Sequence, residues 1–319
     1  MFRFQGSLLF KLRLAYTMLW GLALLIPWLL WRLWPYWYLR PFLLHFILLP
    51  YVITAGATIL TVAVHVSNQL GFDVESTYGV ASCLGKFFIM PSLRILHGYD
   101  VVGVENIPLD RGALIVPYHA LLPVDLYAFI GWFFLRTNKM ISGSIDRLFW
   151  EVPLLRTLFK LSGCTSGGRD ELVAELRNGS LKFILPGGAY EAMFSENYSL
   201  EWRNRTGFAR VAKEADAPII PMFTINTRQL YTMYFFGFRE KLRQWYLEKR
   251  IPILIPSGGW PVKLRTYLGK PLTCGTDESA EEFARRVQAA VEELRDKYQR
   301  RPNSIIKAIA DRFTLSPPN

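Results

Sequence analysis

The feature that most constrains the fold of this chain is a run of seventeen uncharged residues near its N-terminus. Residues 15–31 are almost entirely apolar, and Lys11, Arg13 and Arg32 flank them. A helix of this length is just long enough to cross the hydrocarbon core of a bilayer. An aromatic segment, Trp34–Tyr38, follows in place of the small-residue cleavage site that a secretory signal needs. We therefore expect an uncleaved membrane anchor.

A second apolar run makes a membrane hairpin the expected arrangement. Residues 41–66 contain no Asp, Glu, Lys or Arg, and His45 and His65 are their only histidines. A run of this length can either span the bilayer or bend and re-enter. We expect spans at about 15–31 and 41–64, so that residues 1–66 form an N-terminal hairpin. The basic residues before the first span favour a cytosolic position for residues 67–319.

The composition supports a membrane-associated protein and narrows its partners. The chain is 51% hydrophobic and 15% aromatic, with a net charge of +11 and a mean hydropathy of +0.17. No nucleic-acid-binding motif accompanies this charge, so an anionic lipid surface is the expected partner and nucleic acid is not. The three cysteines are far apart and form no Cys-x-x-Cys pair. They argue against a disulfide framework and a zinc site, and favour a reducing compartment.

Beyond residue 66, short apolar runs alternate with helical patterns, which predicts an α/β sheet with helices on its faces. The expected strands are Tyr99–Val104, Ala113–Pro117, Met140–Ser142, Leu181–Leu185, Pro218–Phe223 and Val262–Leu268. The expected helices are Leu122–Phe134, Leu148–Leu161, Asp170–Arg177 and Gly207–Glu214.

Three further helices are expected outside this alternation. Ser82–Leu96 predicts a helix that either lies on the bilayer or is buried in the core. Gln229–Arg250 has aromatic residues in its first half and basic residues in its second, which favours an amphipathic helix at a membrane interface over a core helix with a solvated basic end. Residues 279–300 have one apolar face, and Ser279 and Glu282 match a capping box, so we expect a structural helix there.

One short stretch carries the strongest sign of chemistry. In Leu114–Asp125 an apolar run ends in His119, and Asp125 follows at the start of the next apolar run. This pattern predicts a strand, a loop and a helix with both polar groups in the turn, where α/β enzymes place reactive residues. The plain alternative is a loop histidine beside a helix-capping aspartate.

Four sequence motifs after Asp125 favour the catalytic interpretation of His119 and Asp125 over the structural one. They are Thr165–Arg169, Pro186–Glu191, Arg205–Phe208 and Ala217–Pro221. Each alone is weak, since a glycine pair after a strand usually marks a tight turn. Together and in this order they resemble the glycerolipid acyltransferase superfamily, and most of all its transmembrane-protein-68 type. The similar blocks are Val104–Pro108, His119 with Leu122–Asp125, Pro186–Gly188 with Glu191, Arg205–Ala209, Pro218–Thr224 and Pro261–Gly269.

The resemblance implies a mixed sheet flanked by helices, a two-helix membrane anchor and a direct acyl transfer. A neutral histidine can take the proton of a lipid hydroxyl as it attacks a thioester, and a carboxylate can orient the ring. His119 is the candidate base and Asp125 its orienter. The glycine pair would let backbone N–H groups approach the thioester oxygen or a phosphate. The expected substrate-binding residues are Arg169, Pro186, Gly187, Gly188, Glu191, Arg205, Gly207 and Phe208.

Two departures from the family pattern bear on the acceptor. Five residues separate His119 from Asp125, where four are usual, and no arginine follows the glycine pair as it does in phosphate-using members. Without that arginine a phosphomonoester loses its bidentate partner, so a neutral mono- or diacylglycerol is favoured. Arg169 keeps lysophosphatidate or another lysophospholipid open as acceptor, and a non-catalytic lipid-binding scaffold is the alternative of another class.

The expected co-substrate is acyl-CoA, with no cofactor and no metal. A metal hydrolase is disfavoured because residues 67–319 hold only His97 besides His119. The expected location is the endoplasmic reticulum membrane, with the acyltransferase domain facing the cytosol.

Overall fold

The computed structural model describes residues 90–144, 150, 159, 164–166, 168–235 and 237–314, all within the compact unit Leu60–Asn319. The expected membrane hairpin, the boundary after residue 66 and most of the helix expected at Leu148–Leu161 lie outside the described residues. Within the described part of the chain, no helix combines the length and the apolar character that a bilayer crossing needs.

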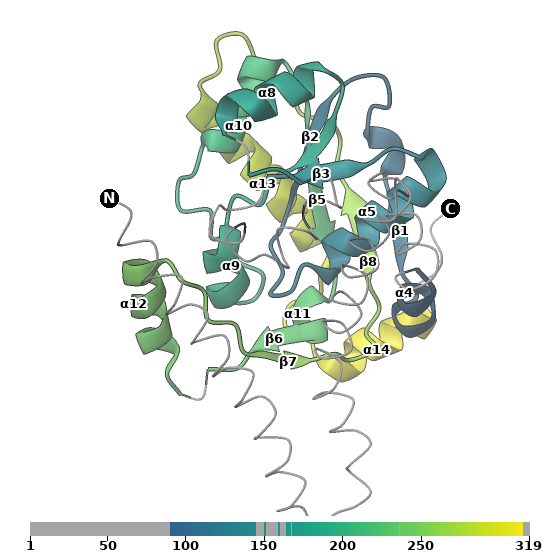
Figure 1. Cartoon of the computed structure of the whole chain (residues 1–319). Coiled ribbons are helices and arrows are strands. Elements are labelled where there is room, and N and C mark those ends of the chain that lie inside the picture. The colour runs from purple at the N-terminus through teal and green to yellow at the C-terminus, as the bar shows by residue number, and fades with distance from the viewer. Residues whose placement is uncertain are drawn as a thin grey trace, which may run out of the picture. The chain divides into compact units, whose positions relative to one another are not determined.

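The centre of the fold is a six-stranded sheet with the order β1-β8-β5-β2-β4-β3 (Figure 1). Its strands are β1 (Asp100–Val102), β2 (Ala113–Pro117), β3 (Ile141–Gly143), β4 (Leu181–Phe183), β5 (Ile219–Thr224) and β8 (Arg265–Leu268). Each lies within or overlaps an expected strand. All neighbouring pairs are parallel except β5 and β8, so the expected mixed sheet is confirmed.

Helices cover both faces of this sheet because neighbouring residues of a strand point to opposite sides. Leu114 and Val116 of β2 pack into one core with residues of α8 (Arg169–Arg177), α10 (Gly207–Ala215) and α13 (Ala280–Tyr298). Ile115, between them, packs into the other core with α4 (Met90–His97) and α5 (Val124–Thr137). All five residues of β2 are buried, as expected for a central strand of a largely parallel sheet.

The capping box expected at Ser279 is present at the start of α13. The Ser279 hydroxyl accepts a hydrogen bond from the amide of Glu282 at 3.2 Å, and the Glu282 carboxylate accepts one from the amide of Ser279 at 2.9 Å. The helix then runs for nineteen residues with Phe283, Val287 and Val291 buried. The expected structural helix over residues 279–300 is therefore confirmed.

The single amphipathic helix expected over Gln229–Arg250 is wrong. The chain forms the short helix α11 (Thr227–Leu230), then strand β6 (Tyr231–Met233), and only then helix α12 (Arg239–Lys249). Strand β6 pairs with β7 (Pro256–Gly258) in a separate two-stranded ribbon. Tyr and Thr favour strands, and Gly237 at φ +78° separates the ribbon from α12.

Four elements of the structure have no counterpart among the expected ones, and strand β7 is one of them. Helix α9 (Gly188–Phe194) starts at the glycine pair that the sequence presents as a turn, and α14 (Ile305–Thr314) follows α13. A short 3₁₀ helix, η3 (Val104–Asn106), follows β1. In Figure 1, α14 lies beside α11 at the lower edge of the sheet, and α12 lies at the left.

Candidate active site

His119 lies in the loop between β2 and α5, at the carboxyl end of a central strand. Its Nδ1 atom is 2.7 Å from the carbonyl oxygen of Ala120, so Nδ1 carries the proton and donates it to this carbonyl. Burial, with a smaller effect from the positive charge of Arg228, lowers the pKa of His119 to about 4, although the hydrogen bond to Ala120 opposes the shift. The ring is therefore neutral at pH 7, with the lone pair of Nε2 available as a proton acceptor.

Asp125 lies in the first turn of α5 and is 3% exposed. Burial raises its pKa to about 7, while a hydrogen bond from the Thr224 hydroxyl and the nearby amides favour the charged form. Thr224 in turn lies 2.8 Å from the hydroxyl of Thr266, and Thr266 lies 2.8 Å from that of Tyr99. None of the hydrogen bonds in the described residues joins Asp125 to the His119 ring. Asp125 is instead fixed to a buried hydroxyl chain that crosses β5 and β8.

Glu191 is completely buried in α9, and the glycine loop is built around its carboxyl group. A Cβ atom on Gly187 would overlap this carboxyl group, so only glycine fits there. Neither carboxyl oxygen has a hydrogen-bond partner of ordinary geometry in the described residues. Burial raises the pKa of Glu191 to about 8, and Arg228, the His119 amide and the Trp202 indole partly offset the rise. The loops of His119 and Glu191 therefore meet.

Arg205 holds the glycine loop from outside. Its Nη1 donates a 2.8 Å hydrogen bond to the carbonyl oxygen of Pro186. Gly188 adopts φ +54°, and a Cβ there would lie 2.8 Å from the same Nη1 atom. The Gly188 amide donates to the Leu185 carbonyl at 3.0 Å, so this expected donor to a substrate is already engaged.

The remaining expected binding residues lie apart from this meeting point. Arg169 starts α8 and pairs with Glu214 of α10 at 2.5 Å, with 57% of its side chain exposed. Gly207 starts α10 at the surface. The Phe208 ring is buried and packs edge-on against Trp202, with ring centroids 5.3 Å apart. Its packing is that of a core residue.

Arg228, in α11, is the cation that joins the two loops. Its Nε donates to the Tyr118 hydroxyl at 2.5 Å, and its two Nη atoms donate to the carbonyl oxygens of Ala192 and Glu191 at 2.8 and 2.7 Å. It therefore connects the residue before His119 to the helix that carries Glu191. Its charge lowers the pKa of both His119 and Glu191.

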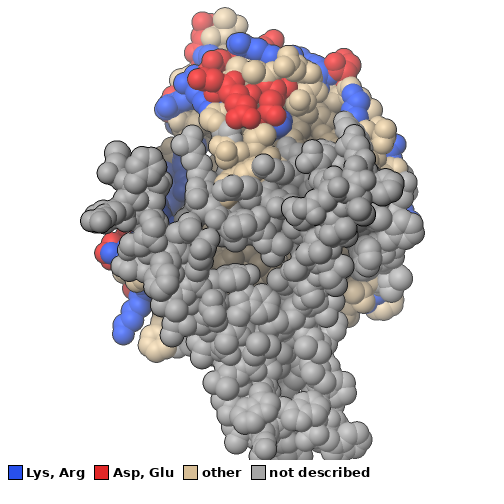
Figure 2. Space-filling view, viewed as in Figure 1, with Lys and Arg blue, Asp and Glu red and all other residues tan. Residues whose placement is uncertain are grey.

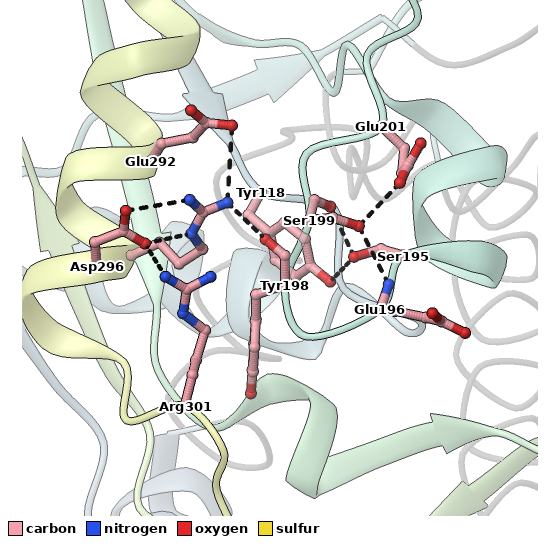
Figure 3. Close-up of polar contacts among 10 residues, drawn as sticks. Tyr118, Ser195, Glu196, Tyr198, Ser199, Glu201, Glu292, Asp296 and Arg301 are labelled. Carbon is pink, nitrogen blue, oxygen red and sulfur yellow. Dashed lines mark hydrogen bonds and ion pairs between the residues drawn. The ribbon is translucent and has the colours of Figure 1, made fainter.

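A polar network fixes Tyr118 on its other side, as Figure 3 shows. The Tyr118 hydroxyl lies 2.9 Å from the Ser195 hydroxyl, which donates to the carbonyl oxygen of Ser199 at 2.7 Å. The Tyr118 ring also packs against Tyr198 and Phe223 at centroid distances of 5.5 and 5.7 Å. The backbone entering the His119 loop is thus held rigidly. Within the described residues, no group of His, Cys, Asp and Glu side chains could hold a metal ion.

Comparison with known proteins shows the family of this chain. The family model described as "Acyltransferase" matches residues 98–225, a range that contains every predicted site residue. A human protein named "DGAT1/2-independent enzyme synthesizing storage lipids" is 41% identical over 225 residues, which cover 69% of this chain and 67% of the human one. This chain belongs to the glycerolipid acyltransferase family.

Other relatives of this acyltransferase lie at greater distances. The chicken protein of the same name is 39% identical over 223 residues, covering 69% of this chain and 66% of the relative. A mycobacterial relative named "Uncharacterized protein Rv0502" is 28% identical, covering 52% and 47%. Among solved structures, the PlsC lysophosphatidate acyltransferase of Thermotoga maritima aligns with a TM-score of 0.45 and 15% identity, over 77% of this chain and 97% of that one.

In this acyltransferase, six of the predicted residues lie together at the carboxyl ends of the central strands. They are His119, Pro186, Gly187, Gly188, Glu191 and Arg205. Asp125 is buried nearby in the first turn of α5, whereas Arg169, Gly207 and Phe208 lie in α8 and α10. Sequence reasoning missed Arg228, which lies three residues beyond the matched range. The position of Arg228 in the chain is a signal that could have indicated its role. Arg228 follows the carboxyl end of β5, and β5 pairs with β2, the strand that leads into His119.

Proposed function

We propose that this acyltransferase moves a fatty acyl group from acyl-CoA to the hydroxyl of a mono- or diacylglycerol. The product is then triacylglycerol or a related neutral lipid. The observation that carries the proposal is the neutral His119 ring, with Nδ1 bonded to the Ala120 carbonyl and Nε2 left as the acceptor. The storage-lipid names of the relatives support a neutral product.

The proposed reaction needs no covalent intermediate on the enzyme. The acceptor hydroxyl gives its proton to Nε2 of His119 while its oxygen attacks the thioester carbonyl carbon. The new C–O bond forms, the C–S bond of the tetrahedral intermediate breaks, and the proton passes from the imidazolium to the leaving thiolate. Arg228 is the nearby positive charge that stabilises the oxyanion through space. Asp125 acts indirectly, by fixing the start of α5 and hence the loop that carries His119.

The state of the arginines supports a neutral acceptor over a phosphate-bearing one. Arg205 is bonded to the Pro186 carbonyl, and Arg228 to two carbonyls and a phenol. Arg169 is held by Glu214 in an exposed ion pair, and such pairs contribute little free energy and break easily. A lysophospholipid acceptor therefore stays the second candidate, with Arg169 as its phosphate partner.

The proposal includes a cellular location and an orientation in the membrane. The enzyme is anchored by residues 1–66 in the endoplasmic reticulum membrane, and its acyltransferase domain faces the cytosol. The absence of paired Cys-x-x-Cys motifs and the basic residues before the first span support this orientation.

An acceptor panel tests the proposed function. Membranes carrying the full chain would receive labelled acyl-CoA with monoacylglycerol, diacylglycerol, lysophosphatidate or a lysophospholipid. We expect labelled neutral lipid from the native enzyme and a loss of about 10²–10⁴-fold in His119→Ala. Arg210→Ala, at an exposed ion pair with Glu281, is the control. Labelled phosphatidate without neutral product would overturn the acceptor, and equal output from folded His119→Ala would overturn catalysis by this residue.

A further inference from the structure

Helix α12 and the segment after it form an apolar groove on the surface. Its volume is about 390 Å³, and its apolar lining consists of Phe235, Phe238, Leu242, Trp245, Ile253 and Ile255. Phe238 is 56% exposed and Trp245 42% exposed. Tyr234 and Leu254, close by in the chain, are exposed as well. Large apolar side chains grouped in this way mark a surface that contacts something other than water.

Helix α12, which contributes Lys241, Leu242 and Trp245 to the lining of this groove, is rich in basic residues. Residues 239–250 contain five basic and two acidic residues, and Lys241, Arg243, Lys249 and Arg250 are all exposed. Lys241 lines the groove, with its Nζ 5.5 Å from the centroid of the Phe238 ring. Figure 2 shows Lys and Arg side chains projecting at the left, where α12 lies in Figure 1, and a mixture of acidic and basic side chains toward the top, where α8 lies. The groove thus has a lysine in its lining, and the helix that borders it carries a net positive charge.

We propose that this surface, defined by Phe238, Trp245, Lys241 and Lys249, docks on an anionic bilayer. Aromatic rings flanked by cations suit the boundary between acyl chains and headgroups, where the rings lie in the apolar layer and the cations meet acidic lipids. The inference rests on the proposed function, because the bilayer is where the lipid acceptor resides. It adds the surface by which the domain meets that bilayer, separately from the expected N-terminal anchor.

The docking surface is joined to the candidate active site by direct contacts. Arg239 donates to the Phe194 carbonyl at 2.9 Å, and Arg243 donates to the Tyr190 hydroxyl at 2.8 Å, so α12 is fastened to α9. Tyr246 of α12 packs in one buried cluster with Leu121, two residues after His119. A bilayer that takes up the exposed side of α12 therefore lies next to the loops of His119 and Glu191.

Site-directed spin labelling tests the docking directly. The full chain would carry one cysteine, Phe238→Cys or Trp245→Cys, in a background with Cys83, Cys164 and Cys274 replaced by serine. Leu109→Cys is the matched control, because Leu109 is 48% exposed but lies before the amino end of β2, whereas the His119 loop follows its carboxyl end. The labelled proteins would be reconstituted in vesicles of phosphatidylcholine, with or without phosphatidylserine.

We expect labels at 238 and 245 to be severalfold more accessible to oxygen, relative to a water-soluble nickel chelate, than the label at 109. The difference should be larger in the anionic vesicles, and Lys241→Glu combined with Lys249→Glu should reduce it, whereas Lys270→Glu should not. Labels at 238 and 245 that stay as water-exposed as the label at 109 would overturn the proposal. Exclusion of both reagents would overturn it too, because that result indicates a protein partner or a second copy of the chain.

The same vesicles separate this inference from the proposed function. If His119→Ala abolishes acyl transfer without changing the depth of the labels, both proposals stand. If the labels lie in the acyl layer but no acceptor is acylated, the docking surface stands and the proposed function fails. If acyl transfer is normal while both labels face water, the function stands and the docking surface fails.

Discussion

Three titratable residues at the candidate site are all shifted toward their neutral forms. Burial lowers the pKa of His119 to about 4 and raises those of Asp125 and Glu191 to about 7 and about 8. A site whose titratable groups are held in their neutral forms suits a reaction between two uncharged groups, an alcohol and a thioester. The neutral histidine is then available as a base at any pH above about 4.

The acid limb of the pH profile reports this shift. A histidine base is lost when it is protonated, so kcat/KM should fall near pH 4 on account of His119 and not near its ordinary value of 6.5. The measurement is acyl transfer in vesicles between pH 4 and 8, made in parallel on Asp125→Asn, which removes the group that titrates at about 7. A limb near 6.5 in both proteins would contradict a buried, neutral His119.

Glu191 should make the folded protein less stable as the pH rises. Its folded pKa of about 8 lies above the ordinary 4.5, so its proton is retained only in the folded state between those values. Stability is full below 4.5 and is lost as the pH rises toward about 8. The native protein should lose about 2–5 kcal/mol of its free energy of unfolding between pH 5 and 8 on account of Glu191, and the Glu191→Gln variant should not show this loss. Chemical unfolding at pH 5 and pH 8 measures this free energy, and Glu171→Gln, at an exposed position, is the control. An equal change with pH in the native protein and in Glu191→Gln would refute the raised pKa.

At the scale of elements, Arg228 holds the short helix α11 against α9 and the end of β2. Its three hydrogen bonds reach two different segments, Tyr118 at the end of β2 and the carbonyl groups of Glu191 and Ala192 in α9. Together with the hydrogen bond between Tyr118 and Ser195, this guanidinium group fixes how the two reactive loops lie relative to one another. Lysine would keep the charge but could not make the forked contacts with both carbonyls.

Removing this arginine should change both rate and pH profile. Arg228→Met should lower kcat/KM by about 10–100-fold and should shift the acid limb of His119 upward, because the cation that lowers its pKa is gone. Arg228→Lys should lower the rate while leaving the limb close to its native position. Arg210→Met, at an exposed ion pair, is the control. An unchanged limb in Arg228→Met would exclude the electrostatic role.

The elements that could be predicted from the sequence are those with local signals. β2 and β5 are continuous apolar runs, and Ser279 with Glu282 marks the start of α13. Helix α9 was missed because two glycines normally signal a turn, and here the first one only makes space for the buried carboxyl group of Glu191.

The missed parts of the site depend on long-range contacts. Arg228 reaches Tyr118, 110 residues away in the chain, and nothing near it in the sequence indicates that partner. Phe208 belongs to a matching sequence block, but its ring packs against Trp202 in the core. A block can thus be typical of a family because it builds the fold, without every residue in it facing the substrate.

At the scale of the whole molecule, helix α14 packs against the segments around Asn226 and Lys263. Asp311 accepts a hydrogen bond from Asn226 at 3.3 Å, and the Ala308 carbonyl accepts one from the amide of Lys263 at 2.8 Å. Ala308 is fully buried. The last helix therefore supports the turn between β5 and α11, and through it the position of Arg228.

Truncation tests this support. A chain ending after Arg301 should lose about 2–5 kcal/mol of stability, because the buried Asn226 side chain loses its hydrogen bonds with Asp311 and Asn303 and the Lys263 amide loses the Ala308 carbonyl. A chain ending after Thr314 keeps all of α14 and serves as the control. Thermal unfolding of both in the same detergent measures the difference, and equal midpoints would show that α14 adds no support.

The place of β8 in the sheet also sets an order of events during synthesis. In the described sheet, β1 pairs only with β8, in a register that joins Asp100 to Arg265, and Asp100 forms ion pairs with Arg265 and Lys263. While a ribosome is still making the middle of the chain, β1 has no strand to pair with and the Asp100 carboxylate lacks its partners. The edge of the sheet must wait until more than 160 further residues have emerged, so the nascent domain stays open through most of its translation.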